Sequence, residues 1–459
     1  MTFIHRLLPG SAFALLLAQA PAAAQGISAQ DATALRAQIA ALKAQVEQLE
    51  ARLDAAETAS AQAPTAAAPA TETADAAQTS VRWKGGPVFT QGDMTFHPKG
   101  RIQYDAGLLM TPEDVADRAR GYSNELRRLR LGGEGRIGGG IGYKLELELS
   151  DNSVDLVDTF ITYESGAWLV TLGNHNGFQS LDELISDTGG AVMERAAFTD
   201  AFNFERRLGL SVQYRKGIVL AQAGLFSDSA DSLTNDADGA DGGDENNSYS
   251  LDGRIVLAPK WGDTQLHVAA SGHWRDFQRL SSVGQRYRQR AYLHSANSRF
   301  LATPQIVGKS ESHYGLEFAG ERGPFWWASE AHWLRVSQAG VADPLFFGGY
   351  GEVGYVLTGE QRGYKNGIFG TVTPDSPVGS GGWGALQATL RYDYLDLNDR
   401  TITGGTQNAL IGALVWTPVE FLRLNVNYAH LRYTDAAILA GSDADYSVDV
   451  IGWRAELDF

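Results

Sequence analysis

Apolar and polar side chains alternate at the end of the chain, from position 451 to position 459. The apolar residues are Ile451, Trp453, Ala455, Leu457 and Phe459, and the intervening ones are Gly452, Arg454, Glu456 and Asp458. Successive side chains of a β-strand point to opposite faces, so this segment predicts a strand with one apolar and one largely charged face. The pattern is expected of the closing strand of a membrane β-barrel, and also of an edge strand in a soluble β-sandwich.

The same alternation recurs from position 100 onwards and favours the barrel. It predicts sixteen strands, at 100–109, 122–137, 141–150, 155–164, 167–174, 206–216, 218–227, 248–258, 263–275, 311–320, 325–338, 346–359, 382–396, 406–417, 421–434 and 446–459. The connections at one end of the expected barrel are short turns. Those at the other end are long loops, at 110–121, 175–205, 228–247, 276–310 and 435–445. The connection 360–381 is an exception, because it is long but lies at the end with the short turns. This asymmetry is typical of outer-membrane barrels. We therefore expect an all-β fold, a 16-stranded antiparallel transmembrane β-barrel over residues 96–459.

Three segments precede the expected barrel. Residues 1–24 have the pattern of a signal peptide, whose apolar core at 11–20 is too short to span a membrane. Large aliphatic residues spaced 4-3-4-3-4 between Leu35 and Leu53 predict a coiled coil over 26–58, although an isolated amphipathic helix has the same spacing. Residues 59–95 are expected to be a linker, because 59–80 are mostly Ala, Thr, Gln and Pro. An even strand number returns the C-terminus to the periplasmic side, where we expect the coiled coil to begin.

Composition narrows the function. The chain has no Cys, which excludes disulfides, thiolate metal sites and Cys nucleophiles. Its net charge of −16 argues against a nucleic-acid partner. No G-x-S-x-G, H-E-x-x-H or P-loop motif occurs, so we expect neither an enzyme nor a cofactor or metal site. The Asp-rich segment 228–247 would offer oxygen ligands to calcium but lacks the EF-hand register, and an exposed acidic loop is favoured.

Three arginines at two-residue spacing are the clearest candidate for binding chemistry. Arg286, Arg288 and Arg290 would share one face of an extended segment, roughly 7 Å apart. Each guanidinium offers a planar fork that suits phosphate oxygens, and several exchangeable sites suit a permeation path. The segment lies in the long loop 276–310, so it could line the pore mouth. Alternatively, it is a solvated basic loop that balances anionic lipopolysaccharide.

Several stretches of the barrel resemble the phosphate-selective porins O and P of bacterial outer membranes. They are 100–103, 126–131, 193–195, 354–360 with Tyr364 and Lys365, and Trp383 with Arg391, Tyr392 and Leu395. The resemblance implies a homotrimeric, sixteen-stranded channel for small anions such as phosphate, with loops folded into the lumen and with lipid and lipopolysaccharide around it. It also implies that Arg286, Arg288 and Arg290 line the vestibule, with His294 at a further basic position. Arg101, Arg127 and Arg128 would then line the narrow zone, with Asp158 beside them.

Two details qualify that expectation. Strand parity puts Arg127 and Arg128 on opposite faces, so a local irregularity is needed for both to reach the lumen. Glu183 aligns with a lysine that contacts the anion in the family, and a carboxylate there would repel phosphate. Two alternatives to a selective anion channel are a non-selective general porin and a structural barrel that ties the envelope together through its coiled coil. The alternative role for the wall arginines is ordinary charge pairing within the barrel wall.

Overall fold

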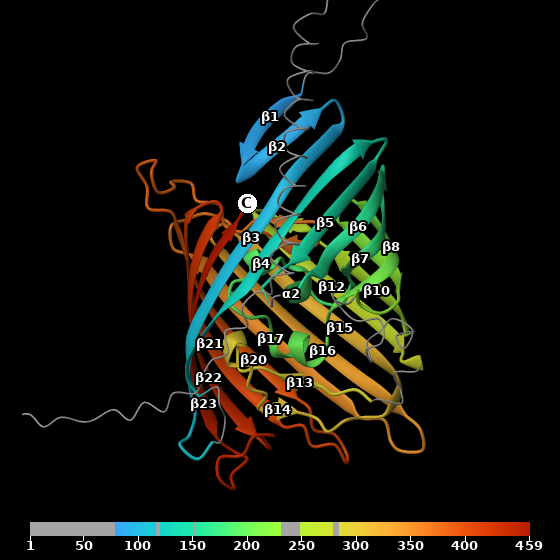
Figure 1. The fold of residues 1–459 in the computed structure, drawn as a ribbon, viewed down its shortest axis with the longest axis vertical. Helices are drawn as coiled ribbons and strands as arrows, with labels where there is room; N and C mark the ends of the chain where they lie inside the picture. Colours follow the sequence, from blue (N-terminus) through green and yellow to red (C-terminus); the bar gives the residue numbers. More distant parts are fainter. Residues whose placement is uncertain (1–78, 116–119, 151–152, 231–247, 279–283) are drawn as a thin grey trace, which may run out of the picture. The chain divides into compact units, whose positions relative to one another are not determined.

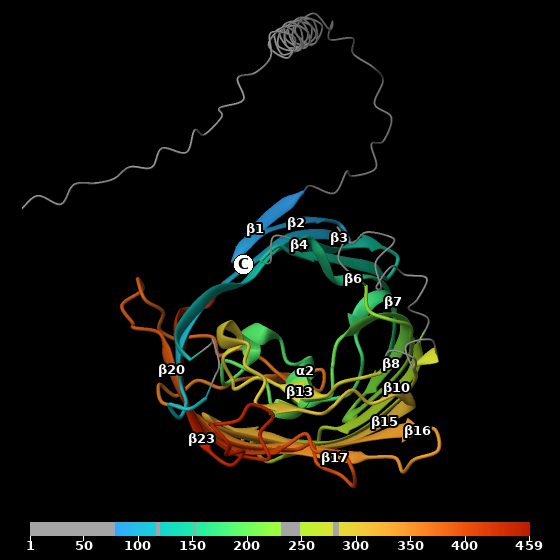
Figure 2. The same cartoon turned by 60° about the horizontal axis from the view of Figure 1, so that its bottom comes forward.

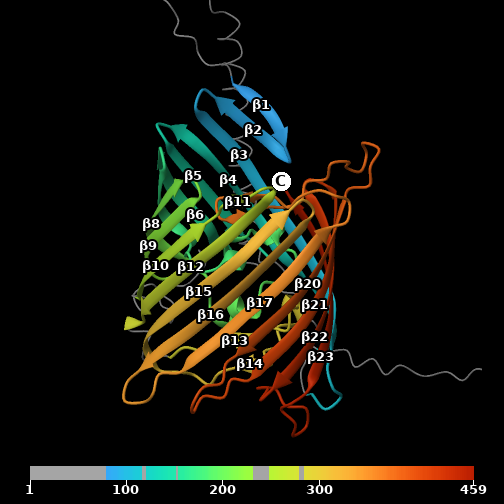
Figure 3. The same cartoon turned by 180° about the vertical axis from the view of Figure 1, so that it is seen from behind.

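The computed structural model describes residues 79–115, 120–150, 153–230, 248–278 and 284–459. The predicted signal peptide 1–24, the coiled coil 26–58 and most of the linker 59–95 lie outside these residues. Within them, sixteen antiparallel strands form a closed barrel, which confirms the predicted fold and strand number (Figures 1 and 3). The strands are β3 (Met94–Met110), β4 (Gly121–Gly138), β5 (Ile141–Glu148), β6 (Asp155–Ser165), β7 (Trp168–Asn176), β8 (Arg206–Lys216), β9 (Val219–Phe226), β10 (Tyr249–Leu257), β12 (Thr264–Asp276), β15 (Gly308–Arg322), β16 (Phe325–Gln338), β17 (Leu345–Val356), β20 (Ala385–Asp396), β21 (Thr406–Val419), β22 (Leu422–Thr434) and β23 (Ser447–Asp458).

The end of the chain closes the barrel against its first strand. β23 pairs with β3 from Asp449 opposite Met110 to Asp458 opposite Arg101. Phe459 continues this pairing, because its backbone N–H and carbonyl both bond to Gly100, at 2.9 and 2.7 Å. All sixteen strands therefore have two neighbours, and the barrel has no open sheet edge.

The wall has a polar inner face and an apolar outer face, as the alternation predicts. In β23, Arg454 and Glu456 are buried, whereas Trp453 and Leu457 are exposed on the outside. The other strands have the same arrangement, with large apolar side chains exposed around the outer surface. This is the opposite of a soluble protein, in which such side chains form the core. An apolar outer surface of this kind is expected of a barrel that is surrounded by lipid. Among the described residues, no helix is long and apolar enough to span a membrane.

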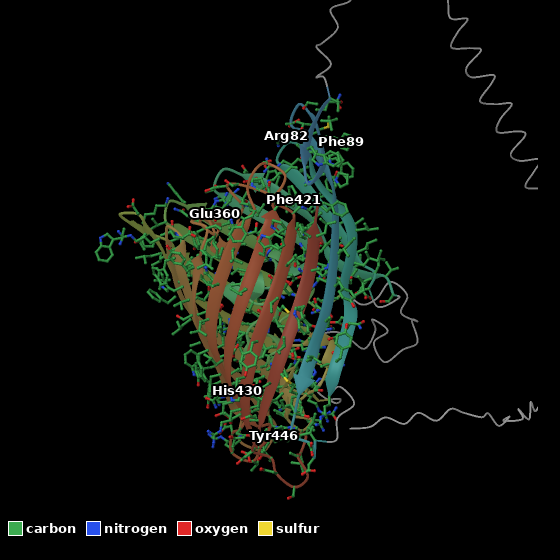
Figure 4. All side chains as sticks on the ribbon, turned by 90° about the vertical axis from the view of Figure 1, so that its left-hand side faces the viewer. Arg82, Phe89, Glu360, Phe421, His430 and Tyr446 are labelled. Carbon is green, nitrogen blue, oxygen red and sulfur yellow. The ribbon has the colours of Figure 1, made fainter. Side chains whose placement is uncertain are left out.

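The two rims of the barrel differ as expected. One rim has two-residue turns such as Gly217–Ile218, where Gly217 takes a φ of 60° that a side chain would disfavour. Phe421 and Glu360 mark this rim in Figure 4, and His430 and Tyr446 mark the opposite one, which carries the long loops. The connection between β17 and β20 is long although it lies at the short-turn rim. It contains β18 (Tyr364–Lys365) and β19 (Ile368–Phe369).

A hairpin before the barrel differs from the predicted linker. β1 (Ser80–Lys84) and β2 (Gly86–Gln91) pair with each other, and β2 continues onto the start of β3 (Figure 1). Elsewhere, β11 (Lys260–Trp261) extends the sheet by pairing with β12 (Figure 3). The rings of Phe89 and Phe96 stack with centroids 6.3 Å apart. The low-complexity composition ends near position 80, and Val81, Trp83 and Phe89 then supply the apolar side chains that a linker lacks.

Candidate functional site

Two long loops fold into the barrel and fill part of its lumen. The loop 177–205 contains α2 (Leu181–Leu184), η1 (Asp187–Gly189) and α3 (Ala197–Ala201). The loop 277–307 contains β13 (Arg288–Gln289), η3 (His294–Ala296) and β14 (Leu301–Ala302). Figure 2 shows α2 and β13 inside the ring of strands. Apolar side chains of both loops pack together with residues of the wall in one buried cluster.

The first loop reaches wall strands far from its own two ends. Ser180 caps α2 by accepting the Glu183 backbone N–H at 3.2 Å. Glu330 of β16 accepts the next free N–H groups, those of Leu181 and Asp182, at 3.0 and 2.7 Å. Arg391 of β20 pairs with the Asp182 carboxylate at 3.1 Å. Strands from the other side of the barrel thus hold α2 in place.

The second loop is fastened in the same manner. The His294 ring contacts the Glu125 carboxylate of β4 at 2.8 Å, and Gln407 of β21 donates to the Tyr292 hydroxyl at 3.0 Å. The loop that carries the arginine triplet therefore folds inward.

Between the two loops and the wall lies a cavity of about 230 Å³. Its charged lining consists of the arginines Arg127, Arg128, Arg195, Arg290, Arg391 and Arg454 and the carboxylates Asp182, Glu183, Asp187, Glu194 and Asp200. Six arginines thus face five carboxyl groups around the cavity.

A β-bulge brings Arg127 and Arg128 to the same side of the wall. In the pairing of β3 with β4, Gln103 lies opposite Arg128 and the next residue, Tyr104, lies opposite Leu126. Arg127 has no opposite residue, which is the extra residue of a bulge. Both arginines line the cavity. This bulge is the local irregularity that two adjacent residues of a strand need if both side chains are to point inward.

Four guanidiniums converge on the carboxylate of Asp187 in η1. Its Oδ2 lies 3.5 Å from Arg101, 3.0 Å from Arg128 and 3.6 Å from Arg130, and its Oδ1 lies 3.0 Å from Arg195. Burial alone would raise the pKa of Asp187, but the positive charge of Arg128 and then of Arg195 outweighs it and holds this pKa well below its usual range. Asp187 is therefore ionised at neutral pH.

Asp158 lies apart from this group. It accepts from Lys144 of β5 and from Arg206 of β8, both at 2.6 Å, and it does not line the cavity. Of the residues predicted for the narrow zone, the structure thus places Arg127 and Arg128 on the cavity. It places Arg101 next to them through Asp187.

Glu183 does line the cavity, at the position where the resemblance expects a cation. Its carboxylate lies 3.4 Å from the Arg195 guanidinium. Burial raises the pKa of Glu183 to about 7, because the opposing effects of Arg195 and Arg206 do not offset the loss of solvent. The group therefore carries only part of a negative charge near neutral pH.

The arginine triplet has the predicted alternation. Arg286 and Arg288 are exposed, whereas the intervening Tyr287 and Gln289 are buried. Neither Arg286 nor Arg288 forms an ion pair with a residue that the structure describes. Arg290 differs from both, because its guanidinium lies 2.9 Å from Asp200.

Other charged groups of the site escaped the sequence reasoning. Asp187 and Asp200 lie in loops without periodicity, and no pattern marks them as partners of arginines. Arg454 was visible on the polar face of the last strand, and a systematic list of inward-facing arginines would have included it. Asp228 was expected in an exposed acidic loop, but it is buried and pairs with Arg275 at 3.1 Å.

Comparison with known proteins shows the family to which this barrel belongs. The family model for phosphate-selective porin O and P matches residues 96–459. An uncharacterized protein of Caulobacter vibrioides is 56% identical over 384 residues, which cover 84% of this chain and 78% of that protein. Porin O of Pseudomonas aeruginosa is 31% identical over 124 residues, covering 26% of this chain and 27% of that protein.

Solved structures share the fold. The anion-selective porin from Comamonas acidovorans has a TM-score of 0.50 at 13% identity, covering 80% of this chain and 100% of that one. Outer-membrane-expressed OmpT of Vibrio cholerae has a TM-score of 0.50 at 9% identity, covering 81% of this chain and 100% of that one. At these identities the likeness concerns the barrel architecture alone.

Proposed function

We propose that this chain, which belongs to the phosphate-selective porin O and P family of outer-membrane porins, passes small anions, phosphate among them, through its lumen. The observation that carries the proposal is the inward loop 277–307, which presents Arg286 and Arg288 on one exposed face without carboxylate partners among the described residues. A free guanidinium attracts anions from solution, whereas a paired one contributes little at a distance.

The proposed path continues from these arginines to the cavity. Arg290 borders the cavity, and Arg127 and Arg128 approach it from the wall through the bulge in β4. The carboxylates among these cations weaken each individual site. Such a series of favourable but exchangeable sites is what conduction requires, because a permeant ion must also leave. We assign Arg101 and Asp158 a positioning role beside this path, because both are held in ion pairs.

The proposal extends to the surroundings of the barrel. We expect the exposed apolar outer wall to contact membrane lipid, with lipopolysaccharide at the long-loop rim. We also expect a homotrimer, as the family implies, with the segment 26–58 as a periplasmic coiled coil. Cross-linking of the purified full chain, followed by denaturing electrophoresis, measures the oligomer number directly.

The near balance of six arginines and five carboxylates around the cavity supports a second candidate, a general porin with little ion preference. The two candidates differ in the sign and size of the reversal potential across a potassium chloride gradient. A marked chloride preference in planar bilayers supports the anion channel, and a potential near zero supports the general porin.

The decisive variant replaces Arg286 and Arg288 with Ala. We expect its chloride preference to fall severalfold, since two unpaired cations leave the path. A matched control replaces Arg335 and Arg400, two exposed arginines whose side chains are about 60% accessible and which pair with Asp343 and Asp399 outside the cavity. An unchanged preference in Arg286→Ala/Arg288→Ala, or equal losses in both double variants, would reject the proposed path.

A further inference from the structure

Asp187 lies among arginines of the barrel wall and of its own loop. We propose that it is a tethered counter-ion, which fills an anion position among them and so prevents the surrounding arginines from retaining phosphate during passage. The inference rests on the proposed function, because it concerns how tightly the same path holds an anion. It assigns Asp187 a specificity-determining role in addition to its place in the loop.

The geometry around Asp187 is that of an occupied anion site. Guanidiniums from β3, from β4 and from the loop 177–205 approach one carboxylate within 3.0 to 3.6 Å. A phosphate or a free carboxylate would receive the same planar donors, because arginine forks bind both groups through paired oxygens. The carboxylate that is present belongs to the protein and cannot diffuse away.

The backbone beneath Asp187 is held independently of its side chain. Arg362 donates to the carbonyl of Gly189 at 2.7 Å, and Arg423 donates to the carbonyls of Thr188 and Gly190, the latter at 2.6 Å. These bonds fix three successive carbonyls after Asp187. Removing the charge of Asp187 therefore leaves the loop with its main attachments at this point.

The four arginines depend on Asp187 to different extents. Three of them have a second carboxylate within ion-pair distance: Arg101 has Asp458 at 3.2 Å, Arg130 has Glu148 at 2.8 Å and Arg195 has Glu183 at 3.4 Å. Among the described residues, Arg128 has no carboxylate but Asp187 within that distance. Arg128 also lines the cavity. Neutralising Asp187 thus releases mainly one guanidinium, at a position that an anion in the cavity can reach.

The experiment measures how inorganic phosphate blocks the chloride current through the full chain in planar bilayers. In Asp187→Asn we expect half-block at about tenfold lower phosphate than in the unmodified protein, since the Arg128 guanidinium loses its carboxylate partner and can form a charged hydrogen bond with phosphate. Adding Arg128→Gln to Asp187→Asn should return the half-block concentration towards that of the unmodified protein. Asp343→Asn removes the same charge at the rim, outside the cavity, and should change nothing.

Each contrary result has a distinct meaning. Unchanged block in Asp187→Asn overturns the counter-ion role, while the chloride preference and the Arg286 and Arg288 variants still decide the proposed function. Increased block that persists when Arg128→Gln is added also overturns the counter-ion role. The effect would then come from a general change in the electrostatic field of the lumen and not from the release of Arg128. If Asp187→Asn forms no channels but the double variant does, Asp187 is only a structural partner of Arg128, and the inference is wrong.

Discussion

Two groups of arginines, one on the barrel wall and one on the loop 277–307, carry the same charge and have opposite surroundings. Arg391 and Arg454 on the wall are buried, and each pairs with two carboxylates at 2.7 to 3.1 Å, one of them on the loop 177–205. Arg286 and Arg288 on the loop 277–307 are exposed and have no such partner among the described residues. We call the first pair the clamping arginines and the second pair the free arginines.

This difference indicates that the electrostatic field in a pore depends on how its arginines are paired and not only on their number. A guanidinium enclosed by carboxylates holds structure together and is largely cancelled at a distance, while an unpaired one acts on ions in solution. The clamping arginines should therefore matter for stability and the free arginines for selectivity.

The largest effect is expected for a clamping arginine. Arg391→Ala leaves Asp182 and Glu352 as unpaired buried carboxylates, because the Arg391 side chain is 1% exposed and lies 3.1 and 2.8 Å from them. Breaking a buried ion pair on one side costs about 3–5 kcal/mol. Chemical denaturation of the purified barrel, followed by tryptophan fluorescence, measures the loss in the free energy of unfolding.

The matched control for Arg391→Ala is Arg288→Ala, which removes the same side chain from the free group. We expect a change in unfolding free energy of less than about 0.5 kcal/mol, as for most surface substitutions. Equal losses in the two variants would contradict the division into clamping and free arginines.

Charge reversal of the free arginines should have the next largest effect. In Arg286→Glu/Arg288→Glu, two attractive charges become repulsive, and we expect the chloride-to-potassium permeability ratio to fall by about tenfold or more. Stability should not change. The reversal potential across a salt gradient gives the ratio, and the same reversal at Arg335 and Arg400 provides the control. A ratio that falls equally in the control would show that only the overall charge of the rim matters.

The sequence predicts the wall well because a strand has a period of two. Sixteen segments keep that period long enough to be recognised, and adjacent Arg127 and Arg128 even mark the bulge, since no regular strand sends both inward. The hairpin β1–β2 was missed because it is short and follows a low-complexity stretch. The resemblance to the porin family correctly placed the inward loops.

The partners of the arginines could not be predicted in this way. Arg290 pairs with Asp200, ninety positions earlier in the chain, and Arg391 pairs with Asp182 across 209 positions. Both carboxylates lie in loops, where no periodicity fixes the direction of a side chain. The folding of the two loops against the wall and against each other determines which arginines are paired and which are free. Only the structure shows this arrangement.

The smallest effect is expected from Glu183, which lines the cavity. Burial raises its pKa to about 7, and the facing charges of Arg195, Arg206, Asp187 and Asp182 contribute in both directions. Below this pH the carboxyl group is neutral and ceases to repel anions, so the chloride preference should rise, by about twofold, as pH falls from about 8 to 6. Because the pKa in the folded state exceeds the unfolded value, stability contributed by this group is lost as pH rises towards 7.

Glu183→Gln separates this titration from others in the lumen. The variant should keep the low-pH preference at every pH, and its current should be measured at several pH values in one salt gradient. If the pH dependence survives in Glu183→Gln, the carboxyl group at position 183 is not the group that titrates. The carboxylate at position 183 would then not explain how this pore differs from one with a lysine there.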